Sequence, residues 1–254
     1  SKWDLGITLS SSADSNAYIF LRFYEWNLFD AVIAGEHTRG RDRWPWAISP
    51  DKQIAIMNSD FFRVQIKVVK DGAIVNLSVT NNSSHDWPEI AAIIPCLSPE
   101  YKRHGIPENP FLFDDEHSRS YFLGSRGLEL LTEREIHFGA QMKSKVLEKS
   151  QDGSGLFSLF SHKWPTSTED AVAGLMVRES VDKTWVAGIA WDHFLSCQGH
   201  NPRKCMHLSA RVGPLKIGET KTLHGKIYLF KGMKEDCVRR FRDDSRGNVP
   251  FESV

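Results

Sequence analysis

Short runs of apolar, β-branched and aromatic residues recur along the chain, and each predicts a strand. The clearest pair is 61–69 (FFRVQIKVV) and 73–80 (AIVNLSVT), separated by Lys70-Asp71-Gly72. Two such runs around an Asp-Gly turn predict a β-hairpin. The other predicted strands are 18–24, 171–178, 184–191, 206–212 and 221–230.

Helical periodicity is confined to the end of the chain. In 233–244 (MKEDCVRRFRDD) the apolar residues Met233, Cys237, Val238 and Phe241 follow an i, i+4, i+5, i+8 pattern, which predicts a short amphipathic helix. Residues 126–135 fit either a helical turn or a strand connection. Many strands and one terminal helix predict an all-β fold, a large antiparallel β-sandwich forming a single domain over 1–254.

Two long loop-rich zones, 35–51 and 95–120, interrupt the strands. Loops of this length inside a compact domain are usually functional or disordered. These two carry tryptophan, histidine, arginine and acidic residues rather than serine and glycine, so we expect them to form the walls of a cleft.

Composition narrows the classes of function. Lys+Arg and Asp+Glu are both 32, so there is no basic excess of the kind that nucleic-acid binding requires. No apolar run approaches the ~20 residues of a membrane span, so we expect no membrane partner. Residues 1–20 do not read as a signal peptide. The compartment stays open between bacterial cytoplasm and, if a signal has been removed, periplasm or secretion; the oligomeric state is also open.

The four cysteines form no CxxC pair, which argues against a zinc ribbon or a thioredoxin-type site. Cys197 and Cys205 fit either a disulfide across a hairpin or two buried free thiols. Eight tryptophans, several of them beside polar residues, suit the core of a large sandwich. They also suit a sugar platform, because a flat apolar ring covers the C–H face of a pyranose.

Two stretches resemble a known family. LSVTNNSSHDWPEI (77–90) and GPLKIGETKTLHGKIYLFKG (213–232) resemble elements of galactose-mutarotase-like β-sandwich proteins, including uncharacterised bacterial proteins associated with glycan breakdown. The resemblance implies a β-sandwich and a role in carbohydrate metabolism, since the family includes sugar epimerases and domains of polysaccharide lyases and glycoside hydrolases. The family's catalytic residues have no matching motif here. A likeness of fold is an analogy for function, not a demonstration of it.

The densest cluster of polar and aromatic residues is 35–46 (GEHTRGRDRWPW). Glu36 and His37 are candidates for an acid–base pair. Arg43 offers a planar fork of donors to a substrate, and Trp44 and Trp46 offer rings for stacking. The alternative is a surface loop whose tryptophans plug the core.

A second cluster, 113–122 (FDDEHSRSYF), contains Asp115 and His117. Paired carboxylates suit glycoside hydrolysis, and a basic residue with a tyrosine or histidine suits elimination from a uronate. A solvated acidic turn is the alternative. In SHKWPTSTED (161–170), Trp164 precedes a proline that restricts it to extended geometry and so aims its ring.

The stretch 191–209 (WDHFLSCQGHNPRKCMHLS) contains three histidines at seven-residue spacing, His193, His200 and His207. Glycine, asparagine and proline between them exclude a helix, so we expect a strand at 191–197, a polar loop at 198–204 and a strand from 206. His200 is then at the loop tip. Gln198 and Arg203 in the same loop offer amide and guanidinium donors that suit sugar hydroxyls.

These patterns predict a carbohydrate-active enzyme that cleaves a glycosidic bond by hydrolysis or elimination. His200 or His37 would transfer the proton, Glu36 or Asp115 would be the carboxylate partner, and Arg43 and Arg203 would hold the substrate. The remaining contacts would come from Trp44, Trp46, His117, Trp164 and Gln198.

The alternatives are a sugar epimerase, a non-catalytic carbohydrate-binding module, and a metal-dependent enzyme using His193, His200 or His207 with Glu36 or His37. The favoured interpretation needs no cofactor and assigns no metal ligand; its partner is a carbohydrate.

Overall fold

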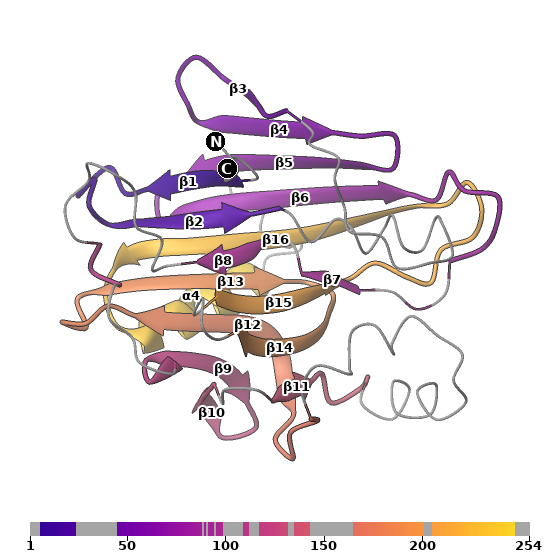
Figure 1. Ribbon diagram of the computed structural model, residues 1–254. Helices are drawn as coiled ribbons and strands as arrows, with labels where there is room; N and C mark the ends of the chain where they lie inside the picture. Colours follow the sequence, from indigo (N-terminus) through magenta and orange to yellow (C-terminus); the bar gives the residue numbers. More distant parts are fainter. Residues whose placement is uncertain are drawn as a thin grey trace.

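The computed structural model describes residues 6–23, 45–87, 89, 91–93, 95–98, 109–111, 117–131, 135–142, 165–200 and 205–246. Within them, two antiparallel sheets stack face to face (Figure 1). The larger sheet has nine strands, in the spatial order β10 (Gly127–Leu130), β9 (Ser120–Gly124), β12 (Ala171–Glu179), β13 (Trp185–Trp191), β16 (Thr220–Lys231), β6 (Gly72–Thr80), β5 (Phe62–Val69), β4 (Ile54–Asn58) and β3 (Ala47–Ile48).

The smaller sheet has seven strands. Their order is β1 (Gly6–Ser10), β2 (Tyr18–Arg22), β8 (Cys96–Ser98), β15 (Cys205–Arg211), β14 (Phe194–His200) and β11 (Ile136–Phe138), with β7 (Ala91–Ile93) also paired to β15. The predicted all-β antiparallel sandwich is therefore confirmed.

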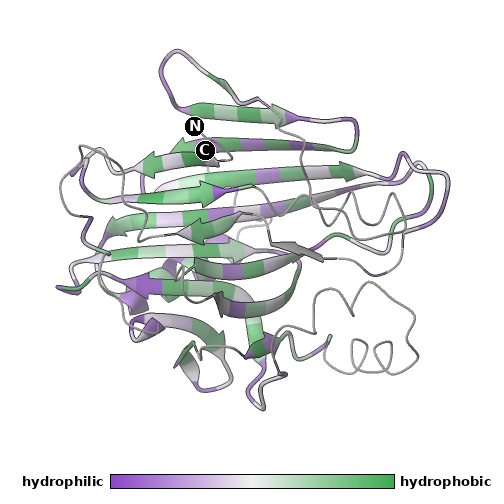
Figure 2. Ribbon diagram, in the orientation of Figure 1, coloured by the Kyte–Doolittle hydropathy of each residue, from purple (hydrophilic) through white to green (hydrophobic). Residues whose placement is uncertain are grey.

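Apolar and polar positions alternate along the strands, and this alternation places apolar side chains between the two sheets. Figure 2 shows green and purple bands alternating along the long strands. One buried apolar cluster includes residues of both sheets, among them Leu21 and Leu208 from the smaller and Val64, Leu77 and Ile227 from the larger. This shared core favours the single-domain prediction, which stays a prediction.

The predicted hairpin is present as β5 and β6, with Val69 paired to Gly72 across the two-residue connection. Gly72 has a φ of 148°, and a Cβ there would lie 1.9 Å from the carbonyl oxygen of Ile227 on β16. The turn therefore needs glycine both for its backbone angle and for the close approach of a third strand.

The predicted C-terminal helix is present as α4 (Lys234–Arg246). Cys237 and Val238 are buried in a second apolar cluster with Val177 and Tyr228, on the face of the larger sheet that points away from the smaller one. In the described ranges, no helix has the length and apolar character needed to cross a membrane.

The structure decides between the two alternatives for residues 126–135, and two predictions around His200 need correction. Residues 126–135 contain a strand, β10, and no helix is described there. The strand expected at 191–197 is interrupted by the bend at Asp192 and His193, so that β13 ends at Trp191 and β14 begins at Phe194. His200 is the last residue of β14, where its backbone pairs with Cys205, and is not at a loop tip. Backbone pairing with β15 extends β14 through His200. The polar side chains of this segment had indicated a loop.

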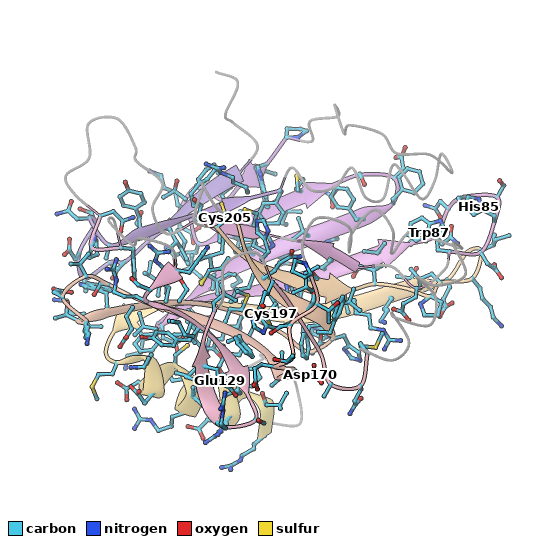
Figure 3. The ribbon with its side chains drawn as sticks, turned by 60° about the horizontal axis from the view of Figure 1, so that its bottom comes forward. His85, Trp87, Glu129, Asp170, Cys197 and Cys205 are labelled. Atoms are coloured by element: carbon cyan, nitrogen blue, oxygen red, sulfur yellow. The ribbon has the colours of Figure 1, made fainter. Side chains whose placement is uncertain are left out.

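The two stretches that resemble mutarotase-like proteins lie against each other. Trp87 forms an isolated antiparallel bridge with Leu215, and the backbone N–H of Gly218 donates to the carbonyl of Asn81 at 2.8 Å. Figure 3 shows His85 and Trp87 together at this edge of the molecule. The resemblance therefore rests on one structural unit, the end of β6 joined to the start of β16.

Candidate functional site

The strands β14 and β15 turn apolar side chains to one side and polar side chains to the other. On β15, Met206, Leu208 and Ala210 belong to the shared core. Because side chains alternate along a strand, Cys205, His207, Ser209 and Arg211 lie on the opposite face. Cys197 of β14 faces the shared core, which leaves Ser196 and Gln198 on that same outward face.

The neighbouring strands continue this outward surface. Ile19, Leu21 and Leu97 face the core, so Arg22 of β2 and Cys96 and Ser98 of β8 face outward. We define the polar face as the outward polar side chains of these strands: Arg22, Cys96, Ser98, Ser196, Gln198, Cys205, His207, Ser209 and Arg211. All of them are buried except the two arginines, which are partly exposed.

Cross-strand pairing sets the order of groups on the polar face. Gln198 is directly opposite His207, and the Ser196 and Ser209 hydroxyls are hydrogen-bonded at 3.2 Å. At the far end of β15, the guanidinium of Arg211 donates to both carboxylate oxygens of Glu89, at 2.7 and 2.9 Å. Charge-assisted bidentate pairs of this kind are directional, so Glu89 is held in one orientation.

Two cysteines and a histidine meet at the centre of the polar face. The ligand atoms of Cys96, Cys205 and His207 all lie within 4.8 Å of one another, and His207 Nε2 lies 3.2 Å from Cys96 Sγ. The thiol of Cys96, with smaller contributions from His207 and Arg22, lowers the pKa of Cys205 well below that of an ordinary thiol, although burial acts in the opposite direction.

The alternative of a Cys197–Cys205 disulfide is wrong, because all four cysteines are free thiols. The register pairs Cys197 with Leu208 and Cys205 with His200, and alternation places the two thiols on opposite faces of the sheet. Figure 3 shows the two residues well separated. Burial alone raises the pKa of Cys197, as expected for a thiol in an apolar core.

A cleft of about 1300 Å³ opens elsewhere, between β1 and the edge formed by β3, β4 and β5. Among the described residues that line it, Asp51 is the only one with a carboxylate. The Ser49 hydroxyl, 2.5 Å from the Asp51 carboxylate, holds the pKa of that carboxyl below its usual value. Asp51 is thus suited to accept hydrogen bonds, and none of the acid–base candidates from the sequence is among the described residues that line this cleft.

Four of the candidate residues identified from sequence fall within the described ranges. Gln198 is on the polar face, and the backbone of His200 is paired to Cys205 at its edge. His117 is buried inside the sandwich, with Nδ1 3.1 Å from the Ser120 hydroxyl and its ring against Gly199. Trp46 is partly buried and packs edge-on to Phe23, with ring centroids 4.9 Å apart.

The other seven candidates lie outside the described residues: Glu36, His37, Arg43, Trp44, Asp115, Trp164 and Arg203. Among the three histidines at seven-residue spacing, His193 is exposed and contacts Asp192 at 3.3 Å, whereas His207 is buried beside the cysteines. The two rings therefore sit in different surroundings.

The meeting of Cys96 with Cys205 and His207 was not predicted from the sequence. The spacing of Cys205 and His207 is a sequence signal for two of the three residues, because residues two apart in a strand share a face. Cys96 is far away in the chain, and only the pairing of β8 with β15 brings it to His207.

No protein-family model matches the sequence, and no curated protein matches it. Among solved structures, the chain is similar to part of a polysaccharide lyase, with 14% identity and a TM-score of 0.38, over 82% of this chain and 26% of the lyase. The chain thus spans about a quarter of that protein's length.

Two further solved structures are similar over most of both chains. One is an Escherichia coli K12 protein provisionally classed as an aldose 1-epimerase, with 13% identity and a TM-score of 0.37 over 77% of this chain and 72% of that one. The other is a galactose mutarotase-like protein from Clostridium acetobutylicum, with 11% identity and a TM-score of 0.38 over 78% and 69%. The weak resemblance to mutarotase-like sandwiches noted in the sequence is thus found again among structures. At these values the chemistry has to be argued from this chain's own residues.

Proposed function

We propose that this protein is a carbohydrate-active enzyme that cleaves a glycosidic bond, by hydrolysis or by elimination, with its substrate bound over the polar face. The observation that carries the proposal is a buried row of amide, imidazole and hydroxyl side chains on the outward face of a sheet whose inward face is apolar. Burying polar groups costs free energy unless they are hydrogen-bonded. Polar side chains on the outward face also add nothing to the apolar core. Such a row suits a ligand dense in hydroxyl groups.

An aromatic ring adjoins this row. Phe20 of β2 pairs with Ser98, and Arg22 lies 5.5 Å from the centre of the Phe20 ring. A sugar offers both a hydroxyl edge and an apolar C–H face, so a binding site for it combines polar donors with rings. This combination supports a carbohydrate ligand more than a uniformly charged one.

We assign proton transfer to His200, which ends β14 where the polar face meets the connection to β15. Gln198 would hold a substrate hydroxyl, and Arg203, in that connection, would hold a carboxylate or hydroxyl. His37 is the alternative proton-transfer group. Glu36 or Asp115 would be the carboxylate partner.

Arg43, Trp44 and Trp164 complete the proposed substrate contacts. His117 is buried against Gly199 and Trp46 is packed on Phe23, so these two are left out of the proposed contacts. In hydrolysis, one group of the acid–base pair protonates the leaving oxygen and the other activates water or attacks the sugar. In elimination, the base removes the proton beside a uronate carboxylate that an arginine neutralises.

The rival interpretation as a non-catalytic binding module requires an exposed tryptophan platform. In the described part of the chain, Trp87, Trp185 and Trp191 are buried and Trp46 is packed against Phe23. Those four rings therefore favour a role in the core, which weakens the binding-module interpretation for this part of the molecule.

The decisive experiment incubates the purified protein with a panel of neutral and uronate polysaccharides. Ultraviolet absorbance of an unsaturated uronate would report elimination, and new reducing ends without that absorbance would report hydrolysis. If neither product forms on any member of the panel, the cleavage proposal is refuted; a change of anomeric form in a free sugar would favour an epimerase.

Two matched substitutions then test the site. His200→Ala should lower kcat by about 10²–10⁴-fold, the range expected for loss of a general acid or base. His193→Ala is the control, because His193 is exposed and lies off the polar face. Equal, near-wild-type rates in both variants would remove His200 from the mechanism.

A further inference from the structure

Cys96, Cys205 and His207 bring three soft or borderline ligand atoms to one point of the polar face. We propose that these three residues bind a zinc ion, with the fourth coordination position left for a water molecule or a substrate oxygen. The inference is independent of glycan cleavage. It differs from the metal-dependent alternative considered from sequence, because His207 is joined by Cys96 and Cys205 and not by Glu36 or His37.

The distances between the ligand atoms fit a tetrahedral ion. Zn–S bonds of about 2.3 Å and Zn–N bonds of about 2.0–2.1 Å place two sulfurs about 3.8 Å apart and a sulfur and a nitrogen about 3.6 Å apart. The observed His207 Nε2–Cys96 Sγ distance is 3.2 Å, and no pair among the three ligand atoms exceeds 4.8 Å. Small rotations of the side chains bring all three atoms to bonding distance.

The backbone holds the three residues in place. Cys205 and His207 alternate along β15, and Met206 between them pairs with Leu97, which follows Cys96 on β8. In this antiparallel register His207 is opposite Cys96. All three side chains are buried on paired strands, so little ordering is left for the metal to impose.

The charges balance on binding. Each thiol gives its proton to solvent and binds as a thiolate, and neutral His207 binds through Nε2, so the complex with a divalent ion carries no net charge. Arg22, whose backbone pairs with Cys96, is partly exposed to solvent. Its guanidinium lies on the same face as the two sulfur ligands and keeps part of its solvation.

The ligand types select the metal. Thiolate and imidazole favour zinc over magnesium or calcium, which prefer oxygen ligands. Structural zinc sites are closed by four protein ligands, whereas sites with three protein ligands keep a position open. On the polar face that open position would lie beside Gln198, which is paired with His207.

The test measures metal on the whole protein, without any substrate. The chain, produced under reducing conditions with zinc in the medium and then dialysed, should retain about one zinc ion per molecule by elemental mass spectrometry. Replacement of zinc by cobalt should give the d–d bands of a tetrahedral ion and a thiolate-to-cobalt charge-transfer band. Neither readout depends on turnover.

Variants locate the ion. Cys205→Ser and His207→Ala should each lose retained zinc and the cobalt bands, with circular dichroism confirming that the chain is folded. Cys197→Ala is the matched control: this thiol is also buried, one strand away, but faces the core, so zinc content should be unchanged.

Three results would overturn the proposal. The first is wild-type protein that retains no zinc after exposure to it. The second is a Cys96–Cys205 disulfide found by peptide mapping of protein kept under reducing conditions, because it would consume both sulfur ligands. The third is zinc retained in folded Cys205→Ser and His207→Ala variants, which would place the ion elsewhere. Since the wild-type measurements need no variant, misfolding of a variant leaves the proposal testable.

Discussion

Replacing Asn81 with alanine should strongly destabilise the fold, because this side chain joins two segments that are far apart in the sequence. Asn81 is fully buried, and its Nδ2 donates to the carbonyls of His85 at 2.9 Å and Leu215 at 3.0 Å. Its Oδ1 accepts from the backbone N–H of Ser83 at 3.0 Å and from the Ser83 hydroxyl at 2.6 Å. The same hydroxyl accepts from the indole N–H of Trp87 at 2.9 Å, which extends the network.

The magnitude follows from the partners left behind. In Asn81→Ala, the carbonyls of His85 and Leu215 and the N–H of Ser83 lose their bonds to this side chain, whereas the Ser83 hydroxyl keeps the His85 carbonyl 3.0 Å away. At about 1 kcal/mol for each lost hydrogen bond, the free energy of unfolding should fall by about 3 kcal/mol. For a chain of this size, that corresponds to a fall in Tm of about 6–12 °C.

Urea unfolding followed by tryptophan fluorescence and circular dichroism measures this change. Asn82→Ala is the control, because Asn82 is the adjacent, exposed asparagine and its side chain contacts only the backbone of Asp60 among described partners. We expect it to cost about 1 kcal/mol or less. If Asn81→Ala shifts the urea midpoint no more than Asn82→Ala does, the buried network does not hold these segments together and the reasoning fails.

Two further predictions concern groups beside the candidate site. In Gly199→Ala, the new Cβ would lie 2.8 Å from the ring of His117, so we expect the free energy of unfolding to fall by about 1–3 kcal/mol. Adding His117→Ala should largely relieve this loss. Purely additive effects of the two changes would contradict the contact. Burial lowers the pKa of His137, which stacks on Phe122 at 4.0 Å, below its usual 6.5. The contribution of His137 to the free energy of unfolding should therefore be complete above pH 6.5. It should diminish as the pH falls below that value, because the unfolded chain then binds more protons than the folded one. The pH dependence of the urea midpoint should be shallower in His137→Gln, and an unchanged slope would show that His137 is not responsible.

Local sequence predicted much of the fold. The alternation in 61–69 and 73–80 indicated both strands, and Asp71-Gly72 indicated their turn. The spacing of Cys237, Val238 and Phe241 predicted α4 within a few residues of its observed bounds. These features succeed because side-chain periodicity within one element is a property of adjacent residues.

The candidate site was only partly predictable. Gln198 was identified by its donor-rich surroundings and does lie on the polar face, but it was expected in a loop and is in a strand. His200 was likewise expected at a loop tip and is the last residue of β14. Strand boundaries depend on the partner that a segment finds, and the pairing of β14 with β15 extends both strands into polar sequence.

The sequence by itself determined which positions of a strand share a face, so that His207 and Ser209 were expected to point the same way. Cys205 joins them because β15 begins one residue earlier than predicted. Only the tertiary structure decided what meets them there. Cys96 reaches His207 because β8 pairs with β15, and Cys197 is kept from Cys205 because the register places it opposite Leu208. Alternation is encoded residue by residue, whereas the choice and register of a distant partner strand depend on how the whole core packs.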